Sequence, residues 1–308
     1  MRSYLPITTT RVTRAALALG ALTLAALVPA ACGDPAPTGA SAGRAGAPGT
    51  HREYGTPIRL GQGRARSYVV LDRKDGGRAL EFGVALDERA MEGLPAHGAG
   101  DGPHGNFVEM LLPLPADNPT PFRLVELDWN PMGHGAPHEA PHFDFHFYTI
   151  TAAERNAIVP TDPQFAAKAG TYPAVATVPP FIVQPAAALG LPPESVAVPR
   201  MGMHWIDVRS PELQIMLGNP DAYRPFTKTF IYGSWDGAFI FMEPMITREY
   251  IVAKRDATDP AVRDEWVPIP TSTSYPQGGF RPDAYRITYD AQAREYRIAL
   301  ALLPAGGA

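Results

Sequence analysis

The chain of 308 residues contains little cysteine and little charge. Cys32 is its only cysteine, so a single chain cannot form a disulfide and must be stabilised by packing or by a metal ion. Charged residues make up 19 % of the chain, the formal net charge is -4, and the basic residues are scattered. Proteins that bind nucleic acid need a concentrated basic surface. The composition therefore argues against nucleic acid as a partner.

The sequence also lacks an apolar run long enough for a membrane-spanning helix. Its longest such run, residues 15–28, is too short to cross a hydrocarbon layer of roughly 30 Å. Arginines precede this run, and the small residues Pro-Ala-Ala end it just before Cys32. A basic start, a short apolar core and a small-residue end are typical of a signal peptide. We therefore predict that residues 1–31 direct export and are removed, which places the mature protein outside the cytoplasm.

Cys32 follows directly after Ala-Ala, and this segment resembles a bacterial lipobox. In that interpretation Cys32 becomes the acylated first residue and the lipid holds the protein to a membrane. The alternative is a secreted protein in which Cys32 is a bystander beside an ordinary cleavage site. Residues 32–57 are mostly Gly, Ala, Pro and Ser, and this composition predicts a flexible tether.

One mainly β domain is predicted over residues 58–305. Paired β-branched and aromatic runs predict hairpins at 67–86 and 284–302, and a further strand is expected at 214–217. Residues 142–148 alternate with period two, which indicates a strand. The 34 prolines and 29 glycines favour short strands joined by loops over a helical protein. We expect a sandwich or a jelly-roll-like barrel with a few short helices.

Histidines are concentrated in one part of this domain. Four of them, His134, His138, His142 and His146, fall close together, and His204 follows later in a Gly-Met-His-Trp segment. Neutral imidazole is the commonest metal ligand, and zinc sites often combine histidines with a carboxylate. The cluster predicts a metal site. The alternative is a set of buried, hydrogen-bonded structural histidines.

Strand geometry limits how these ligands can converge. His142, Asp144 and His146 would point to one face of a strand, but the first and the last would lie roughly 13 Å apart. Either the strand begins after His142, or a bulge re-aims the side chains, or one histidine acts from outside the metal's ligand set. Asp144 is expected to orient an imidazole through its second nitrogen.

Glu243 interrupts an apolar strand just before a proline. A charge in such a strand is costly unless it is paired or bound to a cation. We consider two interpretations. Glu243 is either an exposed strand end, or a metal ligand and general base acting on a metal-bound water.

Several segments together resemble a family of secreted bacterial proteins typified by a Thermus protein under extracytoplasmic sigma-factor control. The segments are DWNPMGH at 128–134, PHFDFHFY at 141–148, GMHW at 202–205, GSWDG at 233–237 and EPMIT at 243–247. The resemblance implies functional roles for His134, His142, His146, His204 and Glu243, and it leaves out His138. It also implies self-association, because the best-known member is an oligomer.

These observations lead to competing functional hypotheses. One is a zinc-dependent hydrolase or lyase acting on a small molecule, with an iron or copper oxygenase as its variant. The other is a non-catalytic metal-binding or oligomeric stress-response protein. An open coordination position beside a pocket would favour the enzyme, and a closed set of four ligands would favour a structural role.

Overall fold

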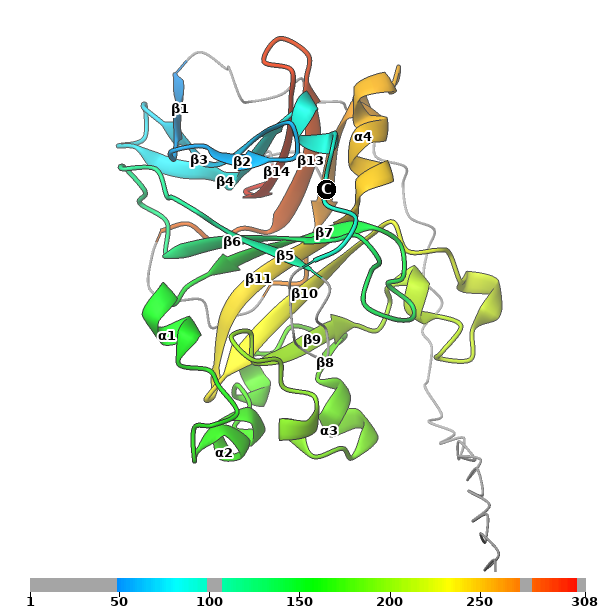
Figure 1. The fold of residues 1–308 in the computed structure, drawn as a ribbon. Helices are drawn as coiled ribbons and strands as arrows, with labels where there is room; N and C mark the ends of the chain where they lie inside the picture. Colours follow the sequence, from blue (N-terminus) through cyan, green and yellow to red (C-terminus); the bar gives the residue numbers. More distant parts are fainter. Residues whose placement is uncertain (1–48, 99–106, 272–278, 304–308) are drawn as a thin grey trace, which may run out of the picture. The chain divides into compact units, whose positions relative to one another are not determined.

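The structure, a computed structural model, describes residues 49–98, 107–271 and 279–303. Cys32, the predicted export segment and most of the predicted tether lie outside these ranges. The described residues form two antiparallel sheets of seven strands each, which face each other as two layers (Figure 1). The prediction of a mainly β protein is therefore confirmed, and the arrangement is a sandwich.

The first sheet joins the two ends of the described chain. Its order is β1-β3-β4-β14-β13-β12, and β2 pairs with β3. Its strands are β1 (Thr50–Tyr54), β2 (Ile58–Leu60), β3 (Gly63–Asp72), β4 (Arg78–Asp87), β12 (Asp264–Pro268), β13 (Ala284–Asp290) and β14 (Glu295–Ala301).

The second sheet is built from the middle of the chain in the order β5-β6-β7-β11-β10-β9-β8. Its strands are β5 (Val108–Leu112), β6 (Leu124–Asn130), β7 (His142–Tyr148), β8 (Ile182–Val183), β9 (Met203–Asp207), β10 (Lys228–Trp235) and β11 (Ala238–Thr247). In this order β11, with Glu243, lies next to β7, and only β10 separates it from β9, with His204.

The helices are short. They are α1 (Ala152–Asn156), α2 (Phe165–Gly170), α3 (Pro185–Leu189), α4 (Arg248–Asp256) and α5 (Pro260–Arg263). Thr151 begins α1 with the capping box that its sequence predicts, because its hydroxyl accepts from the Glu154 backbone N–H while the Glu154 carboxylate accepts from Thr151. Over the residues that the structure describes, none of the helices combines the length and apolarity needed to cross a membrane.

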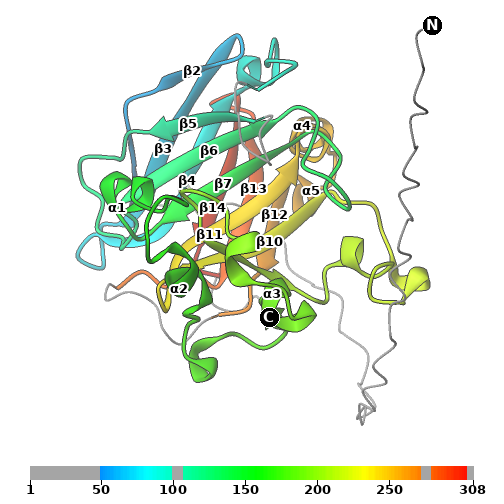
Figure 2. The ribbon, with the colours of Figure 1, turned by 60° about the horizontal axis from the view of Figure 1, so that its bottom comes forward.

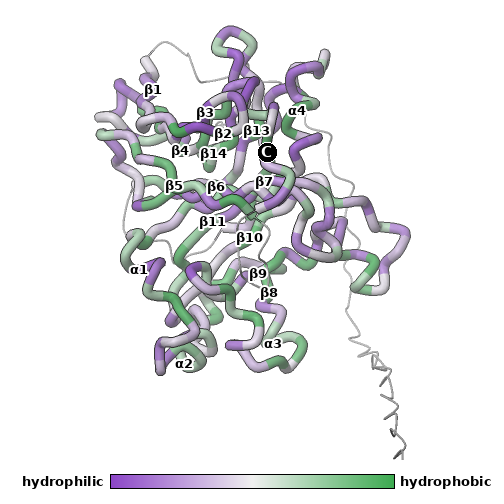
Figure 3. Tube along the Cα trace, in the orientation of Figure 1, coloured by the Kyte–Doolittle hydropathy of each residue, from purple (hydrophilic) through white to green (hydrophobic). Residues whose placement is uncertain are grey.

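Strand β7 separates the core from a polar layer. Phe143, Phe145 and Phe147 are fully buried between the two sheets, as their alternation predicts. The residues between them point to the opposite face, and both hydrophobic and hydrophilic residues occur along β6 and β7 (Figure 3). Helices α1, α2 and α3 lie on that opposite side of the second sheet, in front of its strands in Figure 2. Arg155 of α1 forms an ion pair with the buried Glu126 on that face.

Two segments differ from the prediction. The expected strand at 214–217 is wrong: these residues form a turn, and the Gln214 side-chain amide closes it by donating to the carbonyls of Val208 and Ser210. The residues at 50–54 were assigned to the tether, yet they form β1 and pair with β3 over their full length. Apolar content alone misled in both cases, because a paired edge strand can be polar and a turn can be apolar.

Helix α4 is attached to the first sheet through Glu265 of β12. The Lys254 amine lies 2.6 Å from the Glu265 carboxylate, Tyr250 donates to it at 2.7 Å, and the Lys228 amine lies 3.2 Å away. Burial by itself would raise the pKa of Glu265, but these partners outweigh it and hold that pKa below its ordinary value of 4.5. A carboxylate with a lowered pKa stabilises the fold above its unfolded-state pKa, and this contribution is lost as the pH falls through the folded-state pKa.

We therefore expect Glu265→Gln to lower the free energy of unfolding at pH 7 by roughly 1.5–3 kcal/mol, the range for hydrogen bonds to charged groups. The loss of stability on acidification below about pH 4.5 should also become shallower. Urea unfolding at pH 7 and pH 4 measures both effects. Glu249→Gln, on the exposed side of the same helix, should change neither, and an equal effect in both variants would refute the explanation.

Candidate metal site

The outer face of the second sheet has an unusual content of buried polar side chains. The register of β6 with β7 places Glu126 opposite His146, Asp128 opposite Asp144, and Asn130 opposite His142. All six are at most 5 % exposed. Burying such groups is costly unless they are paired or bind a cation. This face is therefore where a ligand is expected.

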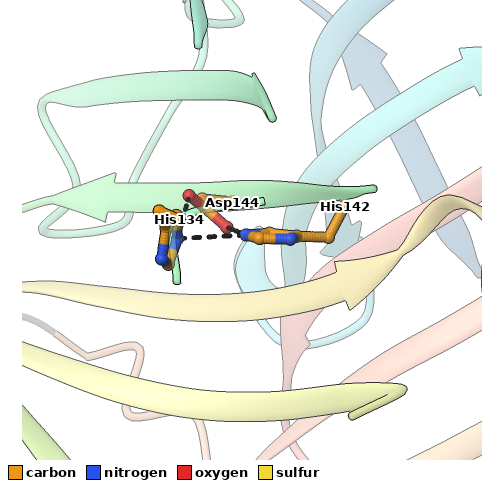
Figure 4. A group of neighbouring side chains, drawn as sticks. All are labelled: His134, His142 and Asp144. Atoms are coloured by element: carbon orange, nitrogen blue, oxygen red, sulfur yellow. Dashed lines mark hydrogen bonds and ion pairs between the residues drawn. The ribbon is translucent and has the colours of Figure 1, made fainter. Parts of the chain in front are cut away.

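Two of these polar groups, His142 and Asp144, converge with His134 from the β6–β7 loop in what we call the first group (Figure 4). The Nε2 atoms of the two imidazoles lie 3.0 Å apart. The Asp144 carboxylate oxygens lie 3.2 Å from His142 Nε2 and 3.5 Å from His134 Nε2. Each residue thus directs one ligand atom toward a common point.

Neighbouring groups hold the first group in place. The Ala140 carbonyl lies 2.6 Å from His142 Nδ1 and accepts a hydrogen bond from it, so Nε2 is the ring nitrogen directed at His134 and Asp144. The Asn130 amide donates to Asp144 at 2.8 Å. Metal-binding histidines and carboxylates are commonly oriented by such partners.

His134 reaches the group from the loop between β6 and β7. Its backbone N–H donates to the His138 carbonyl at 3.2 Å, which folds the loop back on itself. Gly133 precedes it with a φ of 64°, and a Cβ there would lie 2.2 Å from the His138 carbonyl oxygen. Only glycine fits this close approach.

The second group consists of His146, His204 and Glu243. The Glu243 Oε2 atom lies 3.5 Å from His146 Nε2 and 3.9 Å from His204 Nε2. His146 comes from β7, His204 from β9 and Glu243 from β11. The pairs between β7 and β11 on both sides of Glu243 set a register that places Glu243 opposite His146.

Phe241 forms the floor beneath the second group. Its ring centroid lies 4.9 Å from that of His146 and 5.5 Å from that of His204. The ring occupies the space above Gly233, where a Cβ would lie 1.9 Å from a Phe241 ring atom. The absence of a side chain at this position of β10 allows Phe241 to support both imidazoles.

Both groups open onto one cavity of about 270 Å³. In each group two side chains are buried and one histidine is partly accessible, since the side chain of His134 is 24 % exposed and that of His204 is 25 % exposed. The polar residues that line the cavity are Asp128, Asn130, His134, His138, Asp144, His146, Gln184, His204 and Glu243. A small molecule in the cavity would therefore meet ligand atoms from both groups.

In the first group, Asp144 is held in its ionised form, whereas His134 is protonated more readily than usual. Burial by itself would raise the pKa of Asp144, but the neighbouring His142 and His134 hold it well below its usual range. Burial likewise opposes a charged His134, and the Asp144 carboxylate outweighs this effect and raises its pKa. Metal ligands must be deprotonated, so the ionised Asp144 is ready to bind a cation.

In the second group and its neighbours, burial is the main cause of the pKa shifts. Burial lowers the pKa of His146 to about 3, so the ring is neutral. Burial also raises the pKa of Glu243 well above its usual range, and it raises that of Asp128, with nearby Glu126 and Asp144 adding to the effect. A bound cation would reverse this preference and favour the ionised carboxylates.

The structure brings together all the predicted ligands on one face, but it divides them between two groups. All seven residues of β7 pair in register with β6, so the strand neither starts after His142 nor bulges. Asp144 was expected to orient an imidazole through its second nitrogen. It instead faces the Nε2 atoms that would bind the ion, as a third ligand would. The five predicted ligands therefore form two groups of three once Asp144 is included.

Sequence reasoning missed Asp128, and it named His138 in the cluster but left it out of the ligand set. Asp128 Oδ2 lies 3.7 Å from His146 Nδ1, and His138 Nε2 lies 3.7 Å from Glu212. Asp128 could have been noticed, because it is an acidic residue in the apolar Leu124–Trp129 run, as Glu243 is in its own strand. His138 contacts the first group only because the loop folds back.

No protein-family model, no curated protein and no solved structure matches this chain. The family resemblance of the motifs around His134, His146, His204 and Glu243 thus stays a prediction. The structure by itself shows buried histidine and carboxylate groups that could bind a metal ion.

Proposed function

We propose that the protein is an exported, lipid-anchored metalloenzyme, a hydrolase or lyase that acts on a small molecule. In this proposal a divalent metal ion, zinc in the first place, binds to His134, His142 and Asp144. The observation that supports it best is the convergence of two Nε2 atoms, 3.0 Å apart, on the Asp144 carboxylate at the wall of a cavity. Oδ1 of Asp144 lies 3.2 Å from His142 Nε2, and Oδ2 lies 3.5 Å from His134 Nε2.

These separations match the donor spacing around a zinc ion. Zinc binds nitrogen and oxygen at about 2.0–2.1 Å in tetrahedral geometry, which puts neighbouring donor atoms about 3.3 Å apart. The chain has no thiol besides Cys32, so the site must consist of histidine and carboxylate. Such a donor set suits zinc, and iron or copper are the next candidates.

Three protein ligands beside a cavity leave a position for water or substrate, which is typical of a catalytic site. A zinc ion in this position lowers the pKa of a bound water and polarises a carbonyl group. Asp128 lies outside both groups and lines the same cavity, and it would accept a proton once a bound cation favours its ionised form. The volume of about 270 Å³ limits the substrate to a small molecule.

Elemental analysis of the protein purified from an exporting bacterial host tests the proposal. We expect zinc in the wild type and in the control His97→Ala, whose histidine is exposed, and about one ion less per chain in Asp144→Ala. Turnover of small esters, lactones and hydratable substrates should stop on chelation and return with zinc. A mass measurement on the mature N-terminus should show an acylated Cys32.

Equal zinc content in Asp144→Ala and the wild type would refute the first group as the site. If Asp144→Ala lost zinc but the wild type turned over none of the substrates, the non-catalytic metal-binding alternative would be supported instead. An unmodified Cys32, or its absence from the mature chain, would refute the lipid anchor alone.

A further inference from the structure

We propose that His146, His204 and Glu243 bind a second divalent transition-metal ion, separate from the first group, so that one cavity holds two mononuclear sites. The proposal does not depend on the first group binding a metal. It makes Glu243 a ligand and not a free proton acceptor.

The strongest support is a set of buried polar atoms that lack hydrogen bonds. Within the described parts of the chain, both ring nitrogens of His146 and Oε2 of Glu243 are buried without a hydrogen-bond partner. Nearly all buried polar side-chain atoms in native proteins have a partner, and leaving one unsatisfied costs about 1–3 kcal/mol. A cation between His146 Nε2 and Glu243 Oε2 would satisfy an atom of each residue at once.

The positions of the three ligand atoms fit one ion. They all lie within 4.8 Å of one another, and Glu243 Oε2 lies 3.5 Å from His146 Nε2 and 3.9 Å from His204 Nε2. Donors of a bound zinc ion are about 3.3 Å apart. The site therefore needs a contraction of a few tenths of an ångström, and the partly exposed His204 side chain can provide it.

A carboxylate also stands behind the buried imidazole. Asp128 Oδ2 lies 3.7 Å from His146 Nδ1, on the side of the ring away from Glu243. This contact is too long for a hydrogen bond, but it places a carboxylate beside the ring nitrogen that the metal would leave unused, where carboxylates orient metal-bound histidines. A structural histidine without a metal would instead be expected to hydrogen-bond directly through Nδ1 or Nε2.

The two sites cannot share one ion. Strand β7 is extended throughout, so the Cα atoms of His142 and His146 lie roughly 13 Å apart. Metal ions that act jointly on one substrate lie about 3.5–4 Å apart and share ligands. The two groups share no residue, which indicates two separate ions.

The ligand types indicate the class of ion. Two imidazoles and one carboxylate suit zinc or iron(II), whereas calcium and magnesium prefer sites made of oxygen atoms. The second group therefore takes a divalent transition ion.

Cobalt(II) titration of the chelator-treated protein tests the proposal, because the visible spectrum of cobalt(II) reports nitrogen ligands. We expect the wild type and His97→Ala to bind about two cobalt(II) ions per chain. His204→Ala and Glu243→Gln should each bind about one, and His142→Ala should also bind about one. Circular dichroism checks folding, and His204→Gln replaces His204→Ala if the latter unfolds.

The outcomes separate this proposal from the proposed function. The second site would be overturned if the His204 and Glu243 variants bound as many cobalt(II) ions as the wild type. It would also be overturned if the wild type bound a single ion and only His142→Ala lost it. In the second case the first site stands. If His142→Ala matches the wild type while His204→Ala loses one ion, the second site stands and the first fails. If Glu243→Gln lost turnover but kept the full metal content, Glu243 would be a proton acceptor and its role as a ligand would be refuted.

Discussion

Zinc should raise the melting temperature of the chelator-treated protein, and His142→Ala should lose the share of this increase that belongs to the first group. A ligand present at 100 times its dissociation constant stabilises the folded state by about 2.7 kcal/mol per site. For a domain of this size that corresponds to a shift of roughly 5–10 °C. Thermal unfolding with and without zinc measures the difference.

The effect should be large because no other side chain can take the place of the His142 ring in the first group. It is fully buried, its Nδ1 is held by the Ala140 carbonyl, and its Nε2 lies at ligand distance from both His134 and Asp144. Without this ring two ligands are left, and two do not make a strong zinc site.

Comparison of several variants isolates the metal effect from a packing effect. His97→Ala should show the full zinc-induced increase, and His142→Ala combined with His204→Ala should show none. Metal-free forms of each variant provide the baseline, since loss of a buried ring also costs packing energy. An increase in His142→Ala as large as in the wild type would contradict zinc binding by the first group.

The second large effect is expected at Phe145, on the opposite face of the same strand. Phe145→Ala should lower the free energy of unfolding by about 3–5 kcal/mol, the usual cost of removing a buried phenyl ring. Phe145 is fully buried between the two sheets. Urea unfolding in the presence of chelator measures this loss without any contribution from metal.

Two controls make the result specific. Phe145→Leu keeps much of the volume and should cost clearly less than Phe145→Ala. Val175→Ala removes a side chain that is 91 % exposed and should change stability by no more than about 0.5 kcal/mol. If Phe145→Ala were no more costly than Val175→Ala, the packing of β7 between the sheets would be wrong.

Much of the fold was predictable where the pattern is local. The hairpins around β3–β4 and β13–β14 follow from β-branched runs joined by turns, and the capping box at Thr151 follows from residues three apart. The strand expected at 214–217 failed, because three apolar residues in a row look the same in an exposed turn and in a short strand. Strand β1 was missed since its burial depends on pairing with β3.

Most residues of the candidate site could be predicted from the sequence, but their arrangement in space could not. His134, His142, His146, His204 and Glu243 were identified from residue type and from the resemblance, and the structure places all of them on one face of the second sheet. Asp128 was not identified, because only the pairing of β6 with β7 brings its carboxylate near His146.

The sequence by itself determined which residues of β7 face each way, because side chains alternate along any strand. It also determined that the ligands are imidazoles and carboxylates, since the chain has a single cysteine. Only the tertiary structure decided that these ligands form two groups. A strand spaces His142 and His146 too widely to meet. The folded loop that holds His134 supplies a partner to His142, and the sheet order β7-β11-β10-β9 supplies Glu243 and His204 to His146.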